Sequence, residues 1–181
     1  MRNIVREFII TLVITLLIFL ILRLVIGSYS VISQTMEPGM QIGQRLLINK
    51  TAYTFSKPQR GDIVYYTSPD GNLNQMKRII GLPGDVIEIQ DGKVSVNGIT
   101  LSEPYVTNPA AYILLPYQVP PDNYFILGDN RNNSNDSSAG WTVPRANIQG
   151  KAWIFTWPPD KWGSVGNFNL SSQLPAKTTS P

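Results

Sequence analysis

Two residue types that carry much hydrolytic chemistry are missing, since the 181 residues include neither histidine nor cysteine. A Ser-His-Asp triad, a thiol nucleophile and a His- or Cys-ligated zinc site are therefore excluded. If the chain is a hydrolase, its base must be Lys, Asp, Glu or a chain terminus, and a hydroxyl nucleophile needs such a base beside it. Composition leaves an oxygen-ligated metal site open, but no carboxylate cluster has the spacing of a metal-binding loop, so we expect no metal.

Lys77 lies in an apolar, strand-like run from Met76 to Ile80. A lysine amine becomes neutral near pH 7 only when burial disfavours its charged form. Strand alternation places Lys77 and Ile79 on one apolar face and turns Arg78 toward solvent. Taken alone, the same pattern also fits an ordinary solvated lysine on a strand.

The N-terminal segment has the length and composition of a membrane anchor. The apolar run from Phe8 to Ile26 contains a single charged residue and has roughly the 20 residues that a membrane-spanning helix needs. Arg2 and Arg6 precede the run, so the positive-inside tendency places residues 1–7 in the cytoplasm and the chain after Gly27 outside. A cleaved signal peptide is the alternative, because Ser28 to Ser30 offers small residues, although the run exceeds the roughly 7–15 residues of a signal h-region.

From Ser30 onward, short runs rich in Val, Ile, Tyr and Phe alternate with Gly, Pro, Asn and Asp. This pattern predicts a mainly β domain over residues 28–165, built of small antiparallel sheets or an open barrel. The dipeptides Asp91-Gly92 and Asn97-Gly98 predict tight hairpin turns. The predicted strands are Arg45–Asn49, Asp62–Tyr66, Met76–Ile80, Val86–Gln90, Lys93–Asn97, Tyr124–Leu127 and Ala152–Thr156.

Other stretches lack a strand pattern. Thr100–Pro121 holds five prolines and is predicted to be a long excursion, while Gly128–Trp141, dense in Asn, Ser and Asp, is predicted to be a functional loop. The polar tail Gly166–Pro181 is predicted to be disordered. The stretch Trp157–Trp162 has the amphipathic rings that favour lipid headgroups, with core packing as the alternative for Trp153 and its neighbour Trp157.

Four segments resemble the signature boxes of the bacterial type I signal peptidases and occur in that family's order. They are Val31–Met40, Arg60–Val64, Met76–Asp85 and Gly128–Ser137. The resemblance extends through about Phe155. It implies a membrane-bound endopeptidase that removes signal peptides from exported precursors, has the family's β fold, contacts membrane lipid and needs no cofactor. A nucleic-acid partner is not expected, because the net charge is only +3 and the basic residues are scattered.

The resemblance also implies roles for individual residues. Thr35 would be the nucleophile and Lys77 the base. Ser33 and the backbone N–H of Thr35 would hold the oxyanion, although Ser33 could instead be a loop hydroxyl bonded to nearby backbone. Ser134 would hydrogen-bond and orient Lys77. A charged scaffold that supports the site through ion pairs and capping bonds would comprise Asp129, Arg131 and Asp136.

Two positions depart from the family pattern. Threonine stands at position 35 where the family almost always has serine, and its methyl group restricts χ1. The chain is then a working Thr/Lys peptidase, a weakened one, or a tethered homologue that binds extended peptides without cleaving them; a peptidase for specialised precursors is a further alternative. Ser138 replaces a frequent arginine, so Asp136 needs Arg131 or water as its partner. Neither Asp129 nor Asp136 lies in an apolar segment, so no raised pKa is expected.

Overall fold

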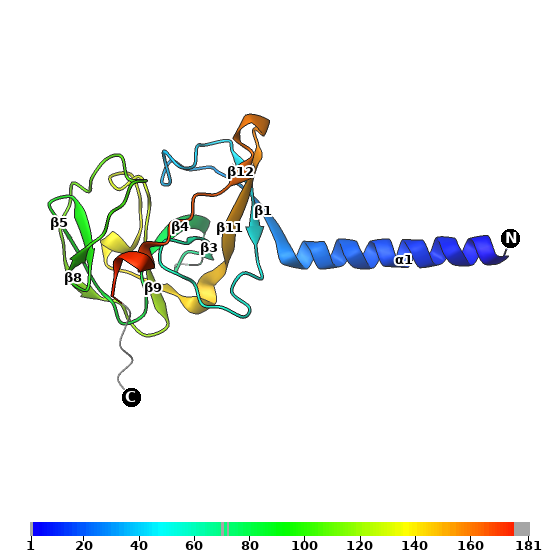
Figure 1. Cartoon of the computed structure of the whole chain (residues 1–181), viewed down its shortest axis with the longest axis horizontal. Helices are drawn as coiled ribbons and strands as arrows, with labels where there is room; N and C mark the ends of the chain where they lie inside the picture. The colour runs from blue at the N-terminus through cyan, green and yellow to red at the C-terminus, as the bar shows by residue number, and fades with distance from the viewer. Residues whose placement is uncertain (1, 70, 72, 176–181) are drawn as a thin grey trace.

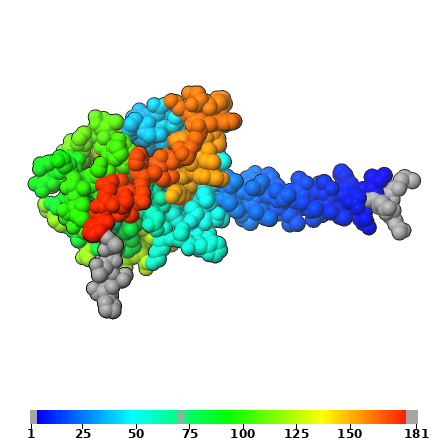
Figure 2. All heavy atoms as spheres, viewed as in Figure 1, coloured from blue at the N-terminus to red at the C-terminus, as the bar shows by residue number. Residues whose placement is uncertain are grey.

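The computed structural model describes residues 2–69, 71 and 73–175, and it contains a long helix that projects from a β domain (Figure 1). Helix α1 (Arg2–Val25) includes a 22-residue stretch, Ile4–Val25, in which an 18-residue window has a mean hydropathy of 3.0 and no burial against the domain. Figure 2 shows the helix extending away from the domain. Within the described residues, α1 is the single helix long and apolar enough to cross a membrane.

Strand β1 (Ile26–Ser30) follows α1 without a linker and pairs along its full length with β2 (Arg45–Asn49). The Lys50 backbone N–H donates to the carbonyl oxygen of Val25 at 2.9 Å, which ties the end of the helix to the sheet. The sequence analysis did not predict β1, because Gly27 and two serines interrupt its short apolar pattern. The sheet thus begins at the last residue of the predicted anchor.

Two antiparallel sheets form the described part of the domain. One has eight strands in the order β1-β2-β11-β3-β4-β9-β10, with β12 paired to β11, and the other has the order β7-β6-β5-β8. The remaining strands are β3 (Ile63–Thr67), β4 (Asn74–Gly81), β5 (Val86–Gln90), β6 (Lys93–Val96), β7 (Ile99–Thr100), β8 (Leu114–Gln118), β9 (Asn123–Leu127), β10 (Val143–Pro144), β11 (Ile148–Trp157) and β12 (Gly163–Ser164). Short 3-10 turns are η1 (Ser137–Ala139), η2 (Arg145–Asn147), η3 (Pro159–Lys161) and η4 (Leu170–Gln173).

All seven predicted strands are present, and the mainly β fold is confirmed. Both predicted hairpin turns are confirmed as well, since Asp91, Gly92, Asn97 and Gly98 all have positive φ angles. The excursion Thr100–Pro121 was wrongly taken to lack a strand, because it contains β8. This strand lies at the edge of its sheet, where a proline is tolerated, and that explains why its Pro116 hid it.

The C-terminal strap, residues 163–174, crosses the outside of the domain from β12 toward the four-stranded sheet (orange to red in Figure 2). The prediction of a disordered tail from Gly166 is wrong for residues 166–175, and residues 176–181 lie outside the described part. Leu170 is 1% exposed, and the Gln173 amide exchanges two hydrogen bonds with the Ser102 backbone at 2.7 and 3.0 Å. A few buried residues among many polar ones are enough to fasten this segment.

Candidate active site

Lys77 and Thr35 meet where strand β4 faces the loop between β1 and β2. The Lys77 Nζ donates to Thr35 Oγ1 at 2.7 Å, although the residues are 42 positions apart. Lys77 is paired with Val64 of β3, and the pairing of β4 with β9 starts only at Arg78. The chain that continues from β9 into the loop 128–136 therefore leaves room for the lysine and threonine side chains.

Lys77 is buried without a compensating ion pair. Its side chain is 1% exposed, and the neighbouring Val64 and Ile79 are fully buried. No carboxylate of the described residues lies within ion-pair distance of its amine. Burial lowers the pKa of Lys77 to about 8, against the opposing attraction of Asp136 and Asp129. The solvated alternative for this lysine is excluded, and the lowered pKa makes part of the amine neutral near physiological pH.

The Thr35 loop is held from two sides. Within the loop, the Met40 backbone N–H donates a hydrogen bond to the Met36 carbonyl oxygen at 2.9 Å. Both methionines are 2% exposed. From the loop after β9, Asn130 donates its backbone N–H to the Thr35 carbonyl and its side-chain amide to the Gln34 carbonyl, each at 3.1 Å. The nucleophile candidate is thus fastened to the loop 128–136 by its own main chain.

Ser33 lies beside Thr35, with the two hydroxyl oxygens 3.3 Å apart. A cavity of about 230 Å³ opens next to these hydroxyls. Its lining combines apolar side chains, hydroxyls and amides, from Tyr29, Ile32, Ser33, Thr35, Leu73, Asn74, Gln75 and Asn135. The oxyanion role predicted for Ser33 stays a prediction, but its hydroxyl is at the candidate site.

Ser134 does not make the predicted hydrogen bond to Lys77 in this structure. Its Oγ is buried and has no hydrogen-bond partner among the described residues. The hydroxyl lies close to Gly128, where an added Cβ would collide with Ser134 Oγ and lie 2.5 Å from the Thr35 carbonyl oxygen. Ser134 and Thr35 therefore approach each other across a glycine, and the orienting role of Ser134 remains a prediction.

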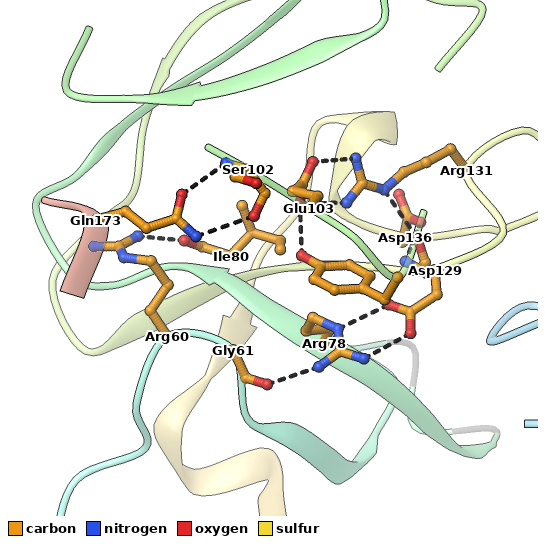
Figure 3. Close-up of polar contacts among 12 residues, drawn as sticks. Arg60, Gly61, Arg78, Ile80, Ser102, Glu103, Asp129, Arg131, Asp136 and Gln173 are labelled. Atoms are coloured by element: carbon orange, nitrogen blue, oxygen red, sulfur yellow. Dashed lines mark hydrogen bonds and ion pairs between the residues drawn. The ribbon is translucent and has the colours of Figure 1, made fainter. Parts of the chain in front are cut away.

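The prediction that Arg78 points to solvent is wrong. Arg78 is 2% exposed and forms a two-pronged ion pair with Asp129, at 2.9 Å from Nε to Oδ1 and 2.7 Å from Nη2 to Oδ2 (Figure 3). The inference from strand alternation does not hold here, because β4 is buried on both faces from Met76 onward. Burial raises the pKa of the Asp129 carboxyl while the Arg78 guanidinium opposes that rise, so the expectation of an unshifted Asp129 is also wrong.

Asp136 finds its partners within its own loop, and neither is Arg131. Its Oδ2 accepts from the Gly128 N–H at 2.8 Å, and its Oδ1 accepts from Ser138, from the hydroxyl at 2.8 Å and the N–H at 3.1 Å. The serine that replaces the family's frequent arginine is itself the partner, because a carboxylate here caps η1.

Arg131 is paired with a residue that the sequence analysis missed. Glu103 accepts from both Nη atoms of Arg131, at 2.8 and 2.5 Å, and from the Tyr105 hydroxyl at 2.6 Å (Figure 3). The Arg131 Nε also donates to the Gly128 carbonyl at 3.1 Å. No local signal could have revealed Glu103, because it precedes Arg131 by 28 residues in a proline-rich excursion.

No group of three or more acidic residues that could hold a metal ion occurs in residues 2–69, 71 and 73–175. The arrangement instead offers a hydroxyl in contact with a buried amine, beside a cavity and two further hydroxyls. Its chemistry is that of a nucleophile with an adjacent base.

Comparison with known proteins identifies the family. The model described as "Signal peptidase, peptidase S26" matches residues 4–157. The signal peptidase I of Leptolyngbya laminosa is 39% identical over 142 residues, which cover 74% of this chain and 70% of the relative. A "Probable signal peptidase I-2" of Synechocystis sp. is 44% identical over 137 residues, covering 72% of this chain and 63% of the relative.

A crystal structure of a signal peptidase I from Enterococcus faecalis V583 overlays 53% of this chain and 97% of its own, with 34% identity and a TM-score of 0.46. The family model spans the helix, the Thr35 loop, β4 and the loop 128–136, so it includes every residue of the candidate site. The chain belongs to the signal peptidase family, peptidase S26.

Proposed function

We propose that this chain is a membrane-tethered endopeptidase that removes signal peptides from exported precursors, with Thr35 as nucleophile and Lys77 as general base. The observation that carries the proposal is the 2.7 Å contact between a buried lysine amine and a threonine hydroxyl. Burial lowers the pKa of that amine to about 8, so about a tenth of it is neutral at pH 7, far more than for a solvated lysine. A neutral amine at this distance is able to accept the hydroxyl proton.

The reaction is an acyl transfer in two stages. Lys77 takes the Thr35 hydroxyl proton while Thr35 Oγ1 bonds to the scissile carbonyl carbon, and the carbonyl electron pair moves to oxygen. The Ser33 hydroxyl and the Thr35 N–H stabilise this oxyanion. Protonated Lys77 then gives its proton to the departing amine, the C–N bond breaks, and an acyl-enzyme remains. Water, deprotonated by Lys77, cleaves the ester and restores the hydroxyl.

The substrate segment is expected to bind as an added strand. The edge of β4 at Asn74–Lys77 has no strand pairing on the side away from β3 in the described chain, because β9 pairs only from Arg78. An extended peptide along this edge would lie next to the 230 Å³ cavity that Thr35 lines. The cavity is small enough to favour short side chains next to the cut.

The anchor is proposed to be retained, with the N-terminus cytoplasmic and the β domain outside. A cut within Ser28–Ser30 would remove most of β1, which pairs with β2 over five positions. Loss of a strand from the edge of the sheet would expose β2 backbone groups. The structure of this region therefore supports an anchor over a cleaved signal peptide.

The hairpin of β11 and β12 is proposed to contact lipid. Trp153, Trp157 and Trp162 are 46%, 53% and 68% exposed, which does not fit the alternative of core packing for the first two. This hairpin is linked through β2 to β1, the strand that continues from the anchor. Exposed indole rings in that position fit the headgroup region of a bilayer.

The test is cleavage of a precursor with an Ala-x-Ala site by the full chain in detergent. We expect wild type and Thr35→Ser to cleave, and Thr35→Ala and Lys77→Ala to lose at least about 10³-fold in kcat/KM. Thr54→Ala and Lys93→Ala, which alter exposed residues of the same types, should behave as wild type. If only Thr35→Ser cleaves, the chain is a non-cleaving binder; if Thr35→Ala cleaves as wild type, the assigned site is wrong.

A further inference from the structure

Arg78 is surrounded by more than its carboxylate partner. Its Nη1 donates to the carbonyl oxygens of Gly61 at 2.9 Å and Gly166 at 3.0 Å (Gly61 is labelled in Figure 3). Its guanidinium carbon lies 3.9 Å from the centroid of the Tyr105 ring and 5.2 Å from that of the Phe168 ring. Two of these contacts, Gly166 and Phe168, come from the C-terminal strap.

Hydrogen bonds and close backbone packing hold the strap against the β domain. The Ile63 N–H donates to the Asn167 side-chain oxygen at 3.0 Å, and the Val165 N–H donates to the Trp153 carbonyl at 2.9 Å. At Gly61, a Cβ would collide with the Phe168 carbonyl, so the backbone of the strap lies directly on this glycine. The fit is close, yet the strap lies beyond residue 157, where the match to the family model ends.

The strap faces the nucleophile loop across a cavity of about 380 Å³. The lining includes Pro38, Gly39 and Met40 of the loop, Gly166 and Phe168 of the strap, and the ion-paired Arg78 and Asp129. None of the residues around this cavity lines the 230 Å³ cavity next to Ser33. The strap is therefore placed to act on the loop and on Asp129 without touching the peptide-binding side.

We propose that the C-terminal strap is a positioning element, in which Phe168 and Gly166 hold Arg78 so that Asp129 and the adjoining Asn130 keep Thr35 in contact with Lys77. The chain of contacts is continuous, since Arg78 binds Asp129 and the Asn130 N–H binds the Thr35 carbonyl. The inference rests on the proposed function for its kinetic consequences, but its structural part concerns the surroundings of the Lys77 amine.

Loosening the strap has two expected effects. A small displacement of Thr35 from Lys77 lowers kcat, by about ten- to hundredfold in Phe168→Ala, and leaves KM within about twofold. A less firmly paired Asp129 attracts the Lys77 ammonium more strongly, and better access of water favours the charged amine too. Both changes raise the pKa of Lys77.

The experiment compares full-length Phe168→Ala, Phe168→Leu and Phe168→Tyr by steady-state kinetics and by ¹³C NMR titration of the Lys77 side chain, assigned with Lys77→Arg. Phe168→Tyr keeps the ring and should restore wild-type values, whereas Phe168→Leu keeps volume without the ring and should stay impaired. Phe55→Ala removes an aromatic ring that is 99% exposed and should change nothing. Val94→Ala, in the core of the four-stranded sheet, reproduces a stability loss without touching Arg78.

The inference is overturned if Phe168→Ala matches Phe55→Ala in both kcat and the Lys77 pKa while wild type cleaves. It is also overturned if Val94→Ala raises the Lys77 pKa as much as Phe168→Ala does, since the effect would then be general loosening. If wild type fails to cleave but Phe168→Ala still raises that pKa, the proposed function fails and the positioning role stands. Should Phe168→Ala not fold, Phe168→Leu carries the same comparison.

Discussion

Two neighbouring cationic side chains on β4, Lys77 and Arg78, are almost equally buried but differ in whether a carboxylate compensates their charge. Lys77 is 1% exposed, and its amine donates to a neutral hydroxyl and has no ion pair in the described chain. Arg78 is 2% exposed and has a carboxylate, two carbonyls and two aromatic rings around it. Burying a charge is costly unless it is paired, and a lysine escapes the cost by losing its proton while an arginine does not. The unpaired side of β4 is therefore suited to catalysis and the paired side to holding the site together.

The largest effect on stability is expected from removing the partner of Arg78. Asp129→Asn leaves an arginine buried without its countercharge, which should lower the free energy of unfolding by about 3–5 kcal/mol. Urea unfolding of the full chain measures it, with the exposed Asp160→Asn as a control expected near zero. The double variant Arg78→Met/Asp129→Leu should recover most of the loss. A loss below about 1 kcal/mol in Asp129→Asn would remove the contrast between the two cations.

Removing the unpaired cation should have the opposite sign. Because burial lowers the pKa of Lys77 from 10.5 to about 8, the unfolded chain binds this proton more tightly, and the protonated amine destabilises the fold by about 3 kcal/mol. Lys77→Met should therefore stabilise the chain by about 2–3 kcal/mol at pH 6, after the lost contact with Thr35 is allowed for.

That gain should shrink as pH rises from 8 toward 10.5, because the folded chain has then lost the proton and removing it from the unfolded chain costs progressively less. The test measures the free energy of unfolding of wild type and Lys77→Met at pH 6 and pH 10. The exposed Lys93→Met is the control and should show no such trend. Equal stability at pH 6, or a gain that grows with pH, would mean that the amine is well solvated.

The smallest effect is expected at another buried cation, Arg131. Glu103→Gln keeps the size of the side chain and an acceptor for the Tyr105 hydroxyl but removes the charge that pairs with Arg131, so we expect a loss of about 1–3 kcal/mol in unfolding experiments. Glu88→Gln, which breaks no ion pair in the described chain, serves as the control. An unchanged free energy of unfolding would contradict this prediction, and would mean that the hydrogen bond to the Gly128 carbonyl is enough to stabilise the buried Arg131.

The contrast between Lys77 and Arg78 also marks what the sequence could predict. The apolar neighbours of Lys77 left both a buried and a solvated lysine open, and the resemblance of two separate segments to one family favoured the buried one and paired it with Thr35. The prediction that Arg78 is exposed was wrong, because strand alternation assumes that one face of the strand is open to solvent. The cover on that face comes from Tyr105 and Phe168, which lie in a proline-rich excursion and a polar tail without periodicity.

The hydrogen-bond and ion-pair partners of Asp136 and Arg131, in the loop 128–136, could not be predicted from the sequence either. Ser138 was taken as a loss for Asp136, but its hydroxyl and N–H are what the carboxylate binds. Glu103 pairs with Arg131 only because the excursion folds back over the loop. Side-chain pairing between irregular segments depends on tertiary packing, which leaves no periodic signal in the chain.

The most direct test of the account is an NMR titration of the Lys77 amine in the full-length protein. Since the base acts only when neutral, a pKa near 8 would give a reactive fraction that increases as pH rises through that value. We predict this value for wild type. A pKa near 10.5, the ordinary value for a solvated lysine, would contradict the claim that a buried amine activates Thr35.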